Sequence, residues 1–181
     1  MKRLFLSIDL PEFVRDDLID LRISSHDVKW TMWDNYHLTL KFLGDDINRH
    51  TEADIIYKLE RLSFERFPLA LSSVGYFGSE KKPRVLYAGV ERSLKLLELQ
   101  KGLVDSLRNL DIELENKKYV PHVTLGRPLK LSYEKVAEFM QSFSTYRSDE
   151  FLVDKFYLMQ SELSRHGAHY SIIHEFELHQ Y

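Results

Sequence analysis

The chain has no cysteine among its 181 residues, which excludes disulfides, thiolate metal ligands and a cysteine nucleophile. It has only 7 glycines and 5 prolines, which argues against long disordered stretches. No run approaches the roughly 20 apolar residues of a membrane-spanning helix. The apolar stretch near the N-terminus is too short for a signal peptide, so we expect a cytoplasmic protein.

An excess of positive charge is also absent, because the formal net charge is −3. A protein that wraps long nucleic acid carries a clearly basic surface, since each neutralised phosphate releases counterions. If this protein acts on RNA, we therefore expect it to bind the end of the RNA rather than a long stretch of it. The 44% hydrophobic and 29% charged content is that of a globular protein, and the length suits one domain over 1–181, with two lobes.

Apolar–polar alternation predicts strands, and apolar residues three or four apart predict amphipathic helices. The strand at 36–43 is expected to stop at a turn formed by Gly44 and Asp45. The predicted strands are 3–10, 36–43, 67–77, 84–91, 119–127, 150–161 and 169–180, and the predicted helices are 11–24, 50–63, 93–110 and 132–143.

Short loops join several of these strands, such as 78–83 between 67–77 and 84–91. This arrangement predicts an α+β protein with mainly antiparallel sheet. The order strand–helix–strand–helix around His37 recurs loosely around His122, which suggests two lobes related by an internal repeat.

Two matching motifs stand out, His-x-Thr-Leu at His37 and again at His122. Side chains two apart on a strand share a face, so His37 lies beside Thr39 and His122 beside Thr124. The residues that follow each histidine and each threonine then face the core: Leu38, Leu40, Val123 and Leu125. A single strand histidine is more simply read as a half-buried residue bonded to a neighbour, but the pair favours a functional interpretation.

Two imidazoles near neutral pKa can act together, one accepting a proton while the other donates one. A threonine hydroxyl beside each can bind a non-bridging phosphate oxygen. These four side chains (His37, Thr39, His122 and Thr124) provide what displacement at phosphorus requires without a metal. A metal site is the main competitor, but there is no cysteine and no carboxylate at a neighbouring same-face position. We therefore predict no metal and no cofactor.

Arg127 follows the second motif and is a candidate for bidentate phosphate binding. Strict strand alternation would put it on the face opposite His122. A bulge at Gly126, or a strand end there, would redirect it.

The sequence resembles the two-histidine phosphoesterases, and within them the bacterial and archaeal RNA 2′,3′-cyclic phosphodiesterases, historically called 2′-5′ RNA ligases. The matching segments span the chain: 4–11, 33–44, 121–127, and then Leu163, Gly167 and Tyr170. The resemblance implies a bilobal fold with two mainly antiparallel sheets, helices on their outer faces, and a pseudo-two-fold axis at a central cleft.

The resemblance also implies roles. His37 would donate a proton to the leaving oxygen and His122 would accept one from the attacking water. Arg127 matches the family's phosphate-binding arginine. Phe42 stands where a ring would stack on the terminal base, although a core phenylalanine is an equally good interpretation. The implied reaction is hydrolysis of an RNA 2′,3′-cyclic phosphate end to a 2′-phosphomonoester, with reversible 2′-5′ ligation as a side activity.

Two other functions stay open at this stage. One is a two-histidine phosphoesterase for a small cyclic nucleotide, and the other is a module that binds RNA ends without turnover. The expected partner is an RNA or oligonucleotide end bearing the cyclic phosphate, with no membrane and no obligate protein partner, and we expect a monomer. Seven basic residues could frame a phosphate-friendly rim, although charged residues in loops are more often merely solvated: Lys41, Lys81, Lys82, Arg84, Lys117, Lys118 and Lys130.

Overall fold

The computed structural model describes residues 1–180, which form two four-stranded sheets, a two-stranded sheet and four α-helices. All of the strand pairs are antiparallel, so the α+β prediction is confirmed. The first sheet has the order β10 (Gly167–Glu177), β9 (Lys155–Ser164), β1 (Lys2–Asp9), β3 (His37–Ile47). The second has the order β2 (Val28–Trp30), β7 (His122–Pro128), β6 (Lys82–Val90), β5 (Leu71–Ser79).

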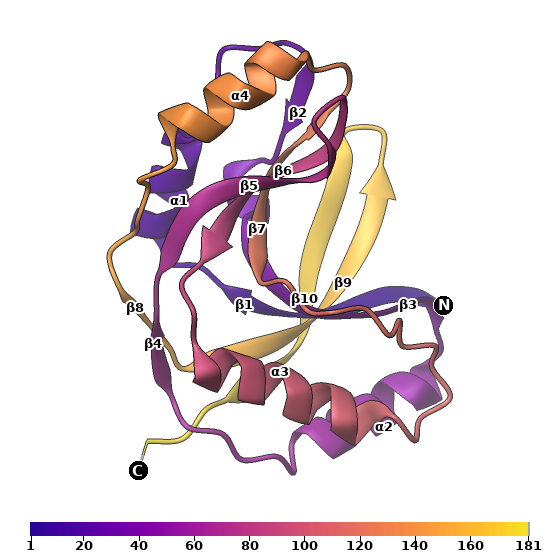
Figure 1. The fold of residues 1–181 in the computed structure, drawn as a ribbon. Helices are drawn as coiled ribbons and strands as arrows, with labels where there is room; N and C mark the ends of the chain where they lie inside the picture. The colour runs from indigo at the N-terminus through magenta and orange to yellow at the C-terminus, as the bar shows by residue number, and fades with distance from the viewer. Residues whose placement is uncertain (181) are drawn as a thin grey trace.

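Three of the four α-helices begin at residues whose side chains accept backbone N–H bonds. Asn48 caps α2 (Arg49–Leu59), Ser93 caps α3 (Leu94–Leu107) and Ser132 caps α4 (Tyr133–Ser142). The remaining helices are α1 (Glu12–Asp20), which follows Pro11, and a short 3₁₀ turn, η1 (Trp33–Asn35). In Figure 1, α2 and α3 lie together below the first sheet, and α1 and α4 lie beside the second.

The predicted helix at 93–110 shows why these segments fold as they do. In α3 the buried side chains recur three or four residues apart, and they bury one stripe of the helix in the core. These side chains are Leu96, Leu99, Leu103 and Leu107.

Several predicted boundaries were wrong. The strand at 36–43 does not stop at Gly44 but runs on to Ile47, because Gly44 adopts a φ of 147° at a shift in register and the pairing with β1 resumes beyond it. The run 67–77 is split at Ala70: β4 (Phe67–Leu69) pairs with β8 (Phe151–Val153), whereas β5 pairs with β6. The predicted strand 150–161 is split at Asp154, because its first part pairs with β4 and its second part, β9, pairs with β1, and the helix predicted over 11–24 ends at Asp20.

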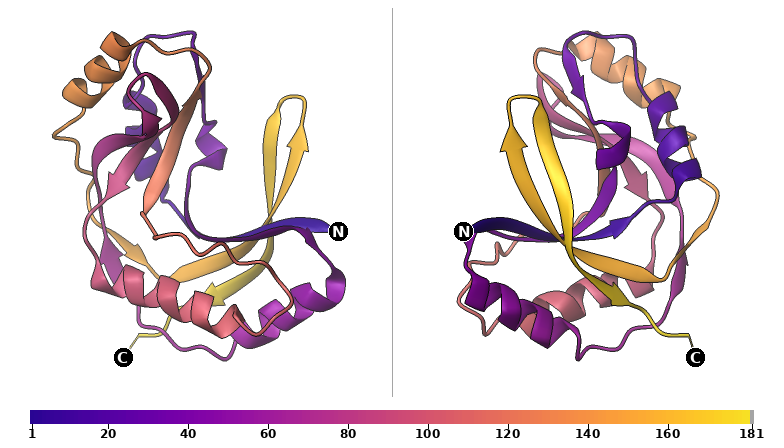
Figure 2. Two further views of the ribbon diagram at one scale, coloured as in Figure 1. Left: turned by 45° about the vertical axis from the view of Figure 1, so that its right-hand side comes forward. Right: turned by 180° about the vertical axis from the view of Figure 1, so that it is seen from behind.

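Figure 2 shows how the sheets frame the site. The β9–β10 hairpin rises on one side, β7 and the rest of the second sheet stand on the other, and β1 and β3 run between them. A pseudo-two-fold repeat relating the two sheets stays a prediction. Among residues 1–180, no helix is long and apolar enough to cross a membrane.

Candidate active site

The two His-x-Thr motifs lie on different sheets and line one cleft of about 540 Å³. His37 and Thr39 come from β3, and His122 and Thr124 come from β7. As the alternation predicts, the intervening side chains are buried in the core: Leu38, Leu40, Val123 and Leu125. The tertiary structure thus brings together two pairs that the sequence could only describe separately.

Both imidazoles are oriented by the same kind of bond. Nδ1 of His37 lies 2.7 Å from the carbonyl oxygen of Asn35, and Nδ1 of His122 lies 2.7 Å from that of Val120. A carbonyl oxygen only accepts, so Nδ1 carries the proton in each ring. In the neutral form, Nε2 of each ring is therefore the nitrogen available to accept a proton.

The two Nε2 atoms have different surroundings. Nε2 of His37 lies 3.0 Å from the hydroxyl oxygen of Thr39, which donates to it when the ring is neutral. Within residues 1–180, Nε2 of His122 has no side-chain or backbone bond. The nitrogen of His122 is thus open to a small molecule in the cleft.

Aromatic rings hold each imidazole in place. His37 lies 5.1 Å, centroid to centroid, from both Phe5 and Tyr170. His122 lies 4.7 Å from Phe77 and 5.5 Å from Tyr87. Phe5 and Tyr170 fall within the family match, but sequence reasoning gave none of these rings a role, because they come from β1, β5, β6 and β10 and no local pattern links them to the motifs.

Burial lowers the pKa of both histidines. For His37 the bond to the Asn35 carbonyl opposes this effect, and the charge of Arg15 adds to it. For His122 the Val120 carbonyl opposes it and the charge of Arg127 adds to it. Both imidazoles are therefore mainly neutral near pH 7 when the cleft holds no anion.

A β-bulge settles the position of Arg127. Thr124 pairs with Tyr87, but Gly126 pairs with Leu86, so β7 has one extra residue at this point. Side-chain alternation is shifted by that residue, and Arg127 lines the cleft with Thr124 instead of facing away from it. The bulge that the sequence offered as one alternative is present.

A second bulge does the same for Phe42. Ser7 pairs with Thr39, but Leu6 pairs with Lys41, so β3 also has an extra residue after its threonine. Phe42 therefore lines the cleft, with 36% of its surface exposed. It is not a core phenylalanine, which was the competing interpretation.

Other residues of the cleft were not expected. Arg3 lines it, with its guanidinium carbon 4.6 Å from the centre of the Phe42 ring. Alternation along β1 was the signal that could have found it, since Arg3 and Phe5 share a face. None of the seven basic residues proposed as a rim lines the cleft, and Lys41 of β3 instead donates to the carbonyl oxygen of Glu115 at 2.5 Å.

The strand that carries His37 is the edge of its sheet, and side chains from elsewhere cover its free carbonyls. The hydroxyl of Tyr119 donates to the carbonyl oxygen of Thr39 at 3.0 Å, and the side-chain amide of Gln100 donates to that of Leu40 at 3.3 Å. Because Tyr119 lies three residues before His122, its bond joins the two motifs directly.

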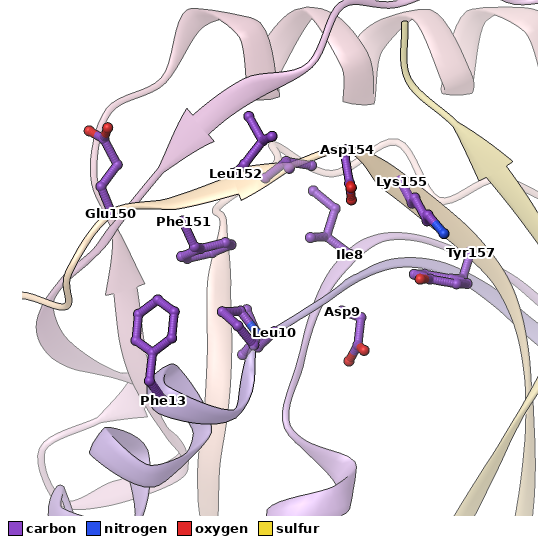
Figure 3. A pocket seen from close by; sticks show the side chains of 12 residues that line it. Ile8, Asp9, Leu10, Phe13, Glu150, Phe151, Leu152, Asp154, Lys155 and Tyr157 are labelled. Atoms are coloured by element: carbon purple, nitrogen blue, oxygen red, sulfur yellow. The ribbon is translucent and has the colours of Figure 1, made fainter. Parts of the chain in front are cut away.

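A second pocket of about 440 Å³ shares no residue with this cleft. It lies between the end of β1 and the β8–β9 segment, and Figure 3 shows Asp9, Asp154 and Lys155 on one side and Phe13 and Phe151 on the other. Neither motif contributes to it. Within residues 1–180, no group of three or more His, Cys, Asp or Glu side chains is arranged to hold a metal ion.

Comparisons with known proteins show which family the sequence and the fold resemble. The family model of LigT-like phosphoesterases matches residues 8–87 and 90–170. A relative from Aquifex aeolicus, named RNA 2′,3′-cyclic phosphodiesterase, is 32% identical over 164 residues, which cover 88% of this chain and 85% of that protein. A relative of the same name from Thermotoga maritima is 30% identical, over 96% of this chain and 94% of its own.

Solved structures give the same result for the fold. A protein of Thermus thermophilus superposes with a TM-score of 0.80 at 28% identity, over 97% of both chains. LigT of E. coli, solved with 3′-AMP, superposes with a TM-score of 0.80 at 24% identity, over 99% of both chains. The chain therefore belongs to the LigT-like phosphoesterases, which confirms both the resemblance to two-histidine phosphoesterases and the prediction of an enzyme.

Proposed function

We propose that this protein hydrolyses RNA ends bearing a 2′,3′-cyclic phosphate to 2′-phosphomonoesters, without a metal. The observation that carries the proposal is the cleft in which two histidines from separate sheets each hold Nδ1 against a carbonyl. The names of the Aquifex and Thermotoga relatives supply the substrate class. The same displacement, with a 5′-hydroxyl attacking phosphorus in place of water and the bond to the 3′-oxygen breaking, would form a 2′-5′ bond, and this ligation would be reversible.

In the proposed reaction, His122 is the base and His37 is the acid. Nε2 of His122 takes a proton from water as the water oxygen attacks phosphorus. The bond from phosphorus to the 3′-oxygen breaks, and that oxygen takes a proton from Nε2 of His37. The open Nε2 of His122 suits the base, and a second turnover begins once the two rings have exchanged protons with solvent.

The acid must be protonated, yet burial lowers the pKa of His37 in the free protein. A bound phosphate would raise the pKa of His37 again, because an anion close to an imidazole favours its charged form. Substrate binding would thus charge the acid that the reaction needs.

The remaining residues would bind the substrate. We propose that the hydroxyls of Thr39 and Thr124 and the guanidinium of Arg127 bind the non-bridging oxygens as charge develops on them. Phe42 presents an exposed ring on which the terminal base would stack. Both sheets contribute to this one cleft, which supports a single domain with two lobes. We expect a cytoplasmic monomer.

The test uses the EDTA-treated protein and a short RNA that ends in a 2′,3′-cyclic phosphate. We expect a 2′-phosphate product, and we expect His37→Ala and His122→Ala to lower kcat by about 10²–10⁴-fold, the usual contribution of a general acid or base. His50→Ala, at an exposed histidine in the first turn of α2, is the matched control and should leave the rate unchanged. Activity that disappears with EDTA and returns with one metal would refute the metal-free mechanism. Turnover of cyclic mononucleotides alone would favour a small-nucleotide enzyme.

A further inference from the structure

The cleft holds more positive charge than one phosphate requires. Within residues 1–180, the lysine and arginine side chains that line it are Arg127, beside His122, and Arg3 on β1. A nucleoside 2′,3′-cyclic phosphate carries a single phosphate, for which Arg127 is already available. Arg3 therefore needs an explanation of its own.

Arg3 lies further along the cleft from His37 than Phe5 does. Phe5 packs against His37, and Arg3 is the next side chain on the same face of β1, roughly 7 Å further along the strand. The phenol of Tyr170, which packs edge-on against His37, is exposed to the charges of both Arg127 and Arg3. The two cations thus face one space from different positions.

The cleft continues beyond Arg3. Ser161 of β9 is the pairing partner of Arg3, and Leu163, two residues further along β9, also lines the cleft with 77% of its surface exposed. Phe42 lies beside Arg3, with its ring under the guanidinium. A nucleotide held by its cyclic phosphate at the histidines, with its base at Phe42, would lie next to Arg3, because the guanidinium and the Phe42 ring are in contact.

The present partner of Arg3 is easily replaced. Its guanidinium forms an ion pair with Asp45, and the side chains are 42% and 62% exposed respectively. Exposed ion pairs of this kind contribute little to stability, because water and salt screen them. A phosphate can bind the planar guanidinium through two parallel hydrogen bonds, which makes it a strong competitor for the carboxylate.

We propose that Arg3 binds the phosphate that joins the terminal nucleotide to the one before it. This inference rests on the proposed function and narrows its substrate class: an RNA end of two or more nucleotides is the better substrate, and a cyclic mononucleotide is the poorer one. Arg3 acts as a specificity residue, because it recognises the preceding phosphate of the RNA strand and not the reacting cyclic phosphate.

The experiment compares kcat/KM for adenosine 2′,3′-cyclic phosphate and for the dinucleotide ApA ending in the same cyclic phosphate. The wild-type protein should prefer the dinucleotide. Arg3→Gln should reduce that preference roughly tenfold, as expected for loss of a charge-assisted hydrogen bond. It should also flatten the log–log dependence of the dinucleotide rate on salt by about one unit.

Two further variants complete the test. Arg92→Gln removes the same charge from an exposed residue that does not line the cleft, and it should change neither the preference nor the salt dependence. Asp45→Asn frees Arg3 from its ion pair, and it should raise kcat/KM for the dinucleotide more than for the mononucleotide.

Equal losses on both substrates in Arg3→Gln would overturn the inference and leave the proposed function standing, since Arg3 would then act only by supporting Phe42. Failure of the wild-type protein to hydrolyse either substrate would overturn the proposed function, and the inference with it. If Arg3→Gln does not fold, as judged by its thermal unfolding, Asp45→Asn decides: an unchanged or smaller dinucleotide preference would refute the role of Arg3.

Discussion

Removing one hydroxyl, by Tyr119→Phe, should weaken catalysis by disturbing the spacing of the two motifs. The Tyr119 hydroxyl donates to the carbonyl oxygen of Thr39 at 3.0 Å, so it ties the segment before His122 to the strand that carries His37. Burial raises the pKa of Tyr119, so this hydroxyl remains a donor throughout the working pH range. Phenylalanine keeps the ring and removes only the bond.

The magnitude follows from burial and geometry. Thr39 lies on an edge strand, so its carbonyl has no neighbouring strand to replace the lost donor. Leaving this part-buried carbonyl unpaired costs about 1–3 kcal/mol in the free energy of unfolding. A displacement of about 1 Å between catalytic groups can lower the rate by up to ~100-fold. We therefore expect kcat to fall between about 10-fold and 100-fold, with a smaller change in KM.

The assay measures kcat and KM on the cyclic-phosphate dinucleotide, together with the urea midpoint of unfolding. Tyr57→Phe is the matched control, because Tyr57 is 58% exposed and does not line the cleft. A Tyr119→Phe protein that loses stability but keeps its full kcat would refute the reasoning, since the bond would then support the fold without setting the geometry of the site.

Three other outcomes follow from the structure. Because burial lowers the pKa of both His37 and His122, the bell-shaped pH profile of kcat/KM should have its maximum below about pH 6.5. The pH profile of kcat should lie at higher pH, because bound phosphate keeps the acid charged there. Coincident profiles of kcat and kcat/KM would contradict this prediction. As the pH falls below about 6.5, His37 takes up a proton in the unfolded chain before it does so in the folded chain, so the free energy of unfolding of the wild-type protein decreases. In urea titrations, His37→Gln should therefore lose less stability than the wild type between about pH 7.5 and pH 5.5. An equal loss in both proteins would argue against the lowered pKa of His37. Gly126→Ala would put a Cβ atom 2.7 Å from Val28 Cγ1 and disturb the bulge that directs Arg127 into the cleft. KM should therefore rise and kcat should fall. A fully active variant would show that the bulge tolerates a side chain.

The sequence determined the elements whose cause is local. Leucines at helical spacing produced α3, and alternation in the two His-x-Thr motifs placed their leucines and Val123 in the core and their polar side chains together on one face. These features depend only on the repeat of a helix or a strand, so one chain segment is enough to predict them. The antiparallel pairing of the strands around 78–83 was predictable for the same reason.

Only the tertiary structure decided how the site is assembled. Alternation within β3 and β7 predicts that Arg127 and Phe42 face away from the histidines, and an extra residue in each strand, visible only through its pairing with a neighbour, reverses that result. Arg3 entered the cleft, and Tyr119 joined the two motifs, through contacts between residues far apart in the chain. Such contacts depend on which strands pair and in which register, and no periodicity within a single segment carries that information.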